Sequence, residues 1–112
     1  MTQDRLLLAL TTVATRADAD ALARAMVEQR LAACAQISAI DSVYRWQGAL
    51  QAEGEFRLLF KTTVGRYPAL EAALRDRHPY ELPAIVALPV AQALTEFADW
   101  VAAEVGDQPA NL

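Results

Sequence analysis

The sequence predicts an α+β fold in which helices cover one face of a four-stranded antiparallel sheet. Three observations predict it. Apolar residues run almost unbroken from Leu6 to Val13, as in a strand covered on both faces. Apolar and polar residues alternate along 53–63, as in a strand with one buried face. Residues 15–31 and 94–105 repeat apolar side chains at helical spacing, which indicates helices beside the sheet.

Length and composition favour one compact domain spanning residues 1–112, with a frayed tail after residue 106. The chain is 54% hydrophobic and 21% charged, and no run approaches the ~18 apolar residues that would span a membrane. It opens Met-Thr-Gln-Asp-Arg without an apolar signal region, so we expect a soluble cytoplasmic protein. With 14 acidic against 10 scattered basic residues, nucleic acid and anionic membranes are not expected partners, because phosphate binding needs clustered Lys and Arg.

The first half of the chain predicts a central strand, a helix and a hairpin. After the strand Leu6–Val13, Thr15 and Asp18 form a capping-box pattern that starts a helix running to about Leu31. Its apolar face carries Ala19, Leu22, Ala23, Met26 and Val27. Two strands then follow, Cys34–Trp46 and Glu53–Thr63, joined by a turn at Gln47-Gly48-Ala49-Leu50. One face of the second strand carries Phe56, Leu58, Phe60 and Thr62, and the other Glu55, Arg57 and Lys61.

The second half predicts a helix, a short strand and a last helix. Pro68 stands near the start of a helix that ends at about Arg77. The proline-bounded segment His78–Pro83 is irregular, and Ala84–Leu88 reads as a strand closed by Pro89. A helix over Leu94–Val105 carries Leu94, Phe97, Val101 and Val105 on one face. The order is that of a ferredoxin-like βαββαβ unit with an extra C-terminal helix.

The predicted hairpin is too long for its own domain. Thirteen residues from Cys34 to Trp46 extend roughly 43 Å, whereas a compact chain of this length has a diameter of roughly 34 Å. Val43, Tyr44 and Trp46 stand near its tip, where a monomer would expose them. We therefore predict a homo-oligomer in which the hairpin packs on a neighbour; the alternative is a bulged or broken strand that folds back.

Signatures of enzymes are absent from the sequence, which has no GxSxG, P-loop, GxGxxG or HExxH motif. Cys34 is the single cysteine, so an internal disulfide and a CxxC motif are excluded. Cys34 and His78 could in principle act as nucleophile and base. A small buried thiol is the favoured interpretation, and no enzymatic activity is expected.

His78 is the only histidine and stands in a proline-bounded loop. It is either a residue that pins the loop or a contact to a ligand or metal. One Cys and one His fall short of a closed metal site in one chain. An oligomer could gather His78 from each subunit, or combine it with Glu53, Glu55 or Cys34 of a neighbour.

Lys61 and three aromatic residues are further candidates. Lys61 is the only lysine beside nine arginines, and its ammonium group could bind an anion or carboxylate; chance in an arginine-rich composition is the alternative. Tyr44, Trp46 and Tyr80 are expected to serve in packing or an interface rather than as a ligand-stacking cage.

Several segments together resemble the CutA divalent-cation tolerance family. The most specific are LAAC at Leu31–Cys34, YRWQG at Tyr44–Gly48, FKTT at Phe60–Thr63 and HPYELP at His78–Pro83. The resemblance covers Leu6 to about Val105. It implies a ferredoxin-like homotrimer whose long hairpins join the sheets of neighbouring subunits, an architecture similar to that of PII-type signalling trimers. It also implies a cytoplasmic protein, in bacteria, without established enzymatic activity.

The same resemblance implies a response to divalent metal ions, with copper, ahead of zinc, as the metal and His78 as its ligand. Some members carry a Cys where this chain has Thr11 and a His where it has Arg77, and neither Thr nor Arg is a good copper ligand. The family's cleft between subunits would bring Trp46, Glu55, Lys61, His78 and Tyr80 together around a small ligand.

Three functional hypotheses therefore stand. The first is a trimer that binds a divalent cation or small ligand at subunit clefts. The second is a PII-like sensor or adaptor that binds a small anionic metabolite through Lys61 and signals to an unidentified partner protein. The third is a non-catalytic structural scaffold.

Overall fold

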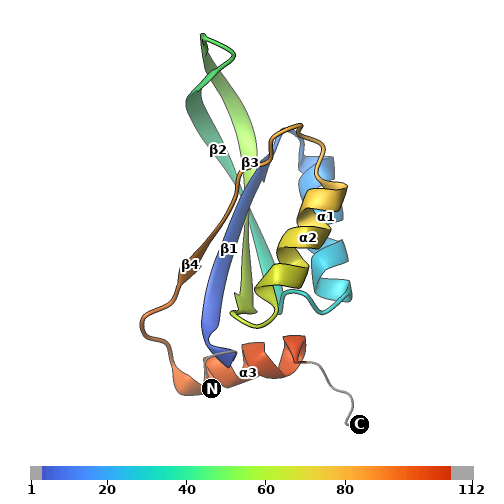
Figure 1. Ribbon diagram of the computed structural model, residues 1–112, viewed down its shortest axis with the longest axis vertical. Coiled ribbons are helices and arrows are strands. Elements are labelled where there is room, and N and C mark those ends of the chain that lie inside the picture. Colours follow the sequence, from blue (N-terminus) through green and yellow to red (C-terminus); the bar gives the residue numbers. More distant parts are fainter. Residues whose placement is uncertain (1–3, 107–112) are drawn as a thin grey trace.

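The computed structural model describes residues 4–106, so the predicted tail after residue 106 lies outside the described residues. A four-stranded antiparallel sheet has the strand order β2-β3-β1-β4, with β1 and β3 in the centre (Figure 1). The elements are β1 (Leu6–Val13), α1 (Arg16–Glu28), β2 (Cys34–Trp46), β3 (Ala49–Thr63), α2 (Tyr67–Arg77), β4 (Ile85–Pro89) and α3 (Thr95–Val105). The predicted ferredoxin-like fold with an extra C-terminal helix is confirmed.

The core lies between the two central strands and the pair of helices α1 and α2. Alternate residues of each strand face the helices, as the period of two requires. On β3 these are Leu58 and Phe60, both fully buried, with Phe56 partly buried beside them. The remaining core side chains include Ala9, Val13, Leu22, Met26, Leu70 and Leu74. The predicted face of β3 is therefore confirmed, and its other face is left for the pocket described below.

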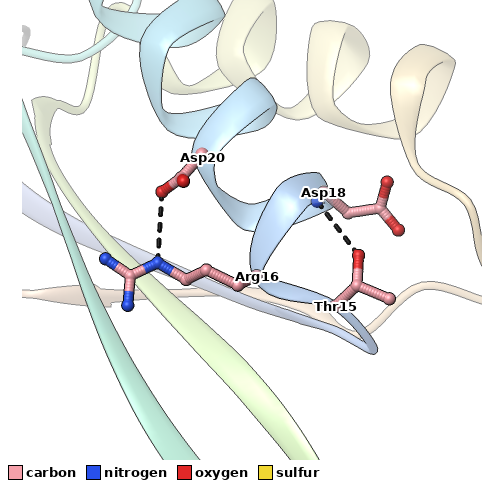
Figure 2. Close-up of polar contacts among 4 residues, drawn as sticks. All are labelled: Thr15, Arg16, Asp18 and Asp20. Carbon is pink, nitrogen blue, oxygen red and sulfur yellow. Dashed lines mark hydrogen bonds and ion pairs between the residues drawn. The ribbon is translucent and has the colours of Figure 1, made fainter.

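Helix α1 begins as predicted and ends earlier than predicted. Figure 2 shows the Asp18 backbone N–H donating to Thr15 Oγ1 at 3.1 Å, which supplies the N-cap, and an exposed ion pair of Arg16 with Asp20. The helix stops at Glu28 rather than near Leu31. Arg30 has a left-handed φ of 59°. Its N–H donates to the Val27 carbonyl and the Leu31 N–H to the Met26 carbonyl, the two bonds of a Schellman motif.

The hairpin turn is tighter than predicted. Trp46 pairs with Ala49, so only Gln47 and Gly48 form the loop, and β3 begins at Ala49 instead of Glu53. Both loop residues have positive φ, 50° and 79°, as a type I′ turn requires. The two strands consequently stay paired to the tip, which projects well beyond the helices (Figure 1), and the long axis of the molecule is 50 Å. The predicted overhang of the hairpin is confirmed.

The C-terminal elements shift by a residue from their predicted bounds. Strand β4 begins at Ile85, and α3 begins at Thr95. Leu94 occupies the N-cap position of α3 and is exposed, so it does not join the apolar face predicted for it, whereas Val101 and Val105 are buried. Helix α3 packs across one end of the sheet (Figure 1). Its Phe97 contacts Lys61, which lies on the face of β3 opposite α1 and α2, so α3 covers part of that face. The rest of that face stays open.

Candidate functional site

A pocket of about 930 Å³ lies between the hairpin and the loop that joins α2 to β4. The strand β3 contributes Glu53, Glu55 and Arg57 to its lining. These residues alternate with Phe56 and Leu58, which face the core. The pocket therefore lies on the sheet face that α1 and α2 leave uncovered. Its other walls come from the end of β1, from residues 40–46 along β2 and from residues 79–84 of the loop.

Glu55 is the most enclosed acidic residue of the pocket, with 7% of its surface exposed. Its Oε2 accepts a hydrogen bond of 2.7 Å from the Tyr80 hydroxyl. Its Oε1 has no hydrogen-bond partner among residues 4–106 and is reached by solvent. Within the same residues the two ion pairs, Arg16–Asp20 and Arg30–Glu104, lie outside the pocket. Glu55 is therefore a nearly buried carboxylate that forms no ion pair within the described residues, although Arg57 lines the same pocket.

Two tyrosines donate to the carboxylates of the pocket. The Tyr44 hydroxyl donates to Glu53 Oε1 at 2.7 Å, as the Tyr80 hydroxyl does to Glu55. The hydrogen bond to Glu53 raises the pKa of Tyr44, while burial, with the hydrogen bond to Glu55, raises the pKa of Tyr80. Both hydroxyls consequently keep their protons at neutral pH and donate them in hydrogen bonds to the two carboxylates.

Both ring nitrogens of His78 are engaged in hydrogen bonds. Nδ1 accepts from the Tyr80 backbone N–H at 3.1 Å. A backbone N–H can only donate, so Nδ1 carries no proton and Nε2–H donates to Thr11 Oγ1 at 2.9 Å. Burial lowers the pKa of His78, against smaller opposing effects of the Thr12 backbone and the charges of Asp18 and Glu55. These bonds favour the loop-pinning interpretation of His78.

The structure brings some predicted site residues together and separates others. Trp46, Glu55 and Tyr80 share the pocket. His78 does not line it and lies beside it, with its ring centroid 5.1 Å from that of Tyr80. Lys61 is outside it, with Nζ 5.4 Å from the ring centroid of Phe97. The expected cluster of five residues is therefore a cluster of three within one chain.

The residues predicted around a metal do not form a closed site. Among residues 4–106, no three His, Cys, Asp or Glu side chains are close enough to hold a metal ion together. Thr11 is buried and bonded to His78, while Arg77 is exposed and lines a separate, smaller hollow with Asp18. Cys34 is only partly buried and pairs across the sheet with Lys61, whereas the bonds of His78 go to Thr11 and Tyr80.

The hydrogen bond between Tyr44 and Glu53 was not predicted, although the sequence of the hairpin turn indicates it. A two-residue loop at Gln47-Gly48 sets the register in which Tyr44 faces Gln51. Glu53 is then its diagonal neighbour on the same face, within reach of a long side chain. The four-residue turn expected at Gln47-Gly48-Ala49-Leu50 gives a different register, so this pair was not predicted.

Comparison with known proteins gives the family. The sequence matches the family model described as CutA1 divalent ion tolerance protein over residues 7–104. The chain belongs to the CutA family. A relative from Thermus thermophilus, the divalent-cation tolerance protein CutA, is 43% identical over 98 residues, which cover 87% of this chain and 95% of the relative.

Solved structures of CutA proteins share the fold. CutA from Synechococcus elongatus superposes with a TM-score of 0.88 at 42% identity, covering 95% of both chains. A second structure of that protein, at a TM-score of 0.84, 40% identity and coverage of 93% and 97%, is described as complexed with a Bis-Tris molecule. CutA from Archaeoglobus fulgidus, described as periplasmic, has a TM-score of 0.87 at 30% identity and coverage of 89% and 98%.

Within residues 4–106, no helix has both the length and the apolar character needed to cross a bilayer.

Proposed function

We propose that this CutA family member is a homotrimeric, non-enzymatic protein of divalent-ion tolerance that binds a positively charged species in the pocket beside the hairpin. The observation that carries the proposal is Glu55, a carboxylate with 7% exposure and no ion pair among the described residues. An unpaired buried charge is costly, and a cation bound at its solvent-reached Oε1 offsets that cost.

The trimer is supported by the uncovered face of the sheet. Val86 and Leu88 are 56% and 53% exposed, and they pair across the sheet with Leu10 and Leu8, so four apolar side chains share this face. Burial of such a face against other subunits stabilises an assembly. Since the pocket opens on the same face, the proposed trimer places it in a cleft between subunits.

Copper, ahead of zinc, remains the metal to test, but the chain's donors around His78 do not fit a copper site. The Nδ1 of His78 is bonded to a backbone N–H, and the neighbouring Thr11 and Arg77 are poor copper ligands. Carboxylate oxygens of Glu53 and Glu55 line the pocket and are the better candidates to hold a cation. We propose the cytoplasm as its compartment.

Calorimetric titration with Cu(II) and Zn(II) tests this function. We expect Glu55→Gln to weaken binding by about tenfold or more, because the pocket loses its buried charge. Glu28→Gln, which removes an exposed charge from α1 outside the pocket, is the matched control and should bind like the parent. If His78→Ala lost metal binding while Glu55→Gln bound the metal like the parent, the ligand would be His78, and the assignment of the cation to the pocket would be wrong.

The anion-sensing alternative depends on Lys61, and the structure places Lys61 against Phe97 instead of in the pocket. Lys61→Met with unchanged ligand-induced thermal shifts would exclude it. The scaffold alternative would stand if no cation or small molecule shifted the melting temperature.

A further inference from the structure

Aromatic side chains accompany the carboxylates of the pocket. Tyr44 and Trp46 come from β2 and Tyr80 from the loop after α2, and all three line the pocket. Three glutamates, Glu53, Glu55 and Glu81, line the same space, against one arginine, Arg57. Asp41 also lines it but pairs with Gly54, so its side chain lies on the opposite face of the hairpin from Glu53 and Glu55. The lining is thus both acidic and rich in aromatic rings.

This lining favours an organic ammonium ion over a bare divalent metal ion as the bound cation. A bare divalent metal needs several ligands at short range, and among residues 4–106 no cluster of three metal-ligating side chains exists. An organic ammonium ion needs instead one carboxylate for its charge and aromatic faces for its alkyl groups. Glu55 supplies such a carboxylate.

The hydrogen bonds of the pocket suit the same ligand. The hydroxyls of Tyr44 and Tyr80 already donate hydrogen bonds of 2.7 Å to Glu53 and Glu55. These bonds fix the polar end of each tyrosine. The solvent-reached Oε1 of Glu55 remains as an acceptor and a charge. A ligand with few donors, a positive charge and an apolar surface matches what is left.

Resting on the proposed cation pocket, we propose that its ligand is a small organic ammonium ion, held by the charge of Glu55 and by contact with the rings of Trp46, Tyr44 and Tyr80. The volume of about 930 Å³ is large for a bare ion and is within the range of pockets for small organic molecules. Glu55 provides the charge selectivity and Trp46 the strongest cation–π surface.

The test compares choline with 3,3-dimethylbutan-1-ol, its neutral analogue of the same shape, by calorimetry in phosphate buffer. We expect choline to bind and the alcohol to bind at least about tenfold more weakly, because only choline carries the charge. Glu55→Gln should weaken choline binding by about tenfold while its amide oxygen still accepts from Tyr80, and Glu28→Gln should leave it unchanged.

A second pair of variants tests the aromatic contribution. Trp46→Leu should weaken choline binding by about fivefold or more. Trp100→Leu is the matched control, since Trp100 is an exposed tryptophan on α3 and outside the pocket. Circular dichroism of each variant checks the fold.

The outcomes separate this inference from the proposed function. Equal binding of choline and the alcohol, or choline binding that survives both Glu55→Gln and Trp46→Leu, would overturn the ammonium ligand. Cu(II) or Zn(II) binding that depends on Glu55, without choline binding, would overturn it too and leave the proposed function standing. Absence of binding by metal and choline alike would overturn both.

Discussion

Two hydrogen bonds tie the loop after α2 to two strands of the sheet, and a third joins His78 to Tyr80 within the loop. His78 Nε2–H reaches Thr11 on β1, the Tyr80 N–H returns to His78 Nδ1, and the Tyr80 hydroxyl reaches Glu55 on β3. The middle bond exists only while Nδ1 is unprotonated. The wall of the pocket that Tyr80 forms therefore depends on a neutral imidazole.

The single histidine allows a direct test of this arrangement. Burial lowers the pKa of His78 below its ordinary value of 6.5, so between the two values the unfolded chain binds more protons than the folded one. The stability that the neutral ring contributes is fully present above pH 6.5 and is lost as the pH falls through the lowered folded pKa. We expect the NMR titration of His78 to have its midpoint below 6.5 in the folded protein and near 6.5 in urea. A folded midpoint above 6.5 would contradict the buried neutral ring.

Arg30 carries backbone strain at the end of α1. A left-handed φ of 59° is unfavourable for a residue with a side chain, and glycine adopts it freely. Arg30→Gly should raise the free energy of unfolding in urea by about 0.5–1 kcal/mol, after the greater freedom of glycine in the unfolded chain is included. Gln29→Gly, at a φ of −83°, should lower it by a similar amount. Destabilisation by both would show that the side chain of Arg30 outweighs the strain.

Among the elements, the β2–β3 hairpin has the tightest backbone requirement. Its type I′ turn needs positive φ at Gln47 and Gly48. A methyl group added at Gly48 would meet no atom within 4 Å, while one at Gly54 would meet only the Ile40 carbonyl oxygen at 3.9 Å. Neither substitution therefore clashes, and the difference between them is conformational.

The two glycines are predicted to respond in opposite directions. Gly48→Ala should lower the free energy of unfolding by about 1 kcal/mol, because alanine disfavours a φ of 79°. Gly54→Ala should raise it by about 0.4–1 kcal/mol by restricting the unfolded chain. Urea unfolding at one protein concentration measures both. Equal effects of the two changes would contradict the type I′ assignment.

Pattern alone predicted the kind and order of every described element, and it failed at their ends. The helical period of α1 continues to Leu31, but the chain leaves the helix at Glu28 through a motif with a left-handed arginine, which no residue preference signals. The strand β3 starts at Ala49 because cross-strand pairing overrides the weak local pattern of 49–52.

At the scale of the whole molecule, the uncovered sheet face supports the proposed trimer. Static light scattering should give three times the mass of one chain. Val86→Lys should shift the mass toward that of the monomer, because it would place a charge among the apolar side chains of that face. Ala72→Lys, at an exposed position of α2, should leave the mass unchanged. A monomeric parent protein would contradict the assembly.

Of the site, the family resemblance placed Trp46, Glu55 and Tyr80 in a cleft between subunits, and within one chain these three residues line one pocket. It also grouped Lys61 with them, because Lys61 shares the face of β3 that carries Glu55. Residues on one face of a strand can still be far apart along it, at about 3.3 Å per residue. Six positions separate Glu55 from Lys61, and α3 covers the far end.

The hydrophobic periods of the chain by themselves determined the α+β class, the order of its elements and the overhang of the hairpin, since these follow from local spacing and length. Only the tertiary structure decided which polar groups from distant parts of the sequence meet. Thr11 and His78 are 67 residues apart, and Glu55 and Tyr80 are 25 apart. These contacts arise because the sheet places β1 beside β3 and the loop crosses both, and no local pattern encodes that crossing. The nearly buried carboxylate of Glu55, which forms no ion pair among residues 4–106, is a product of this arrangement.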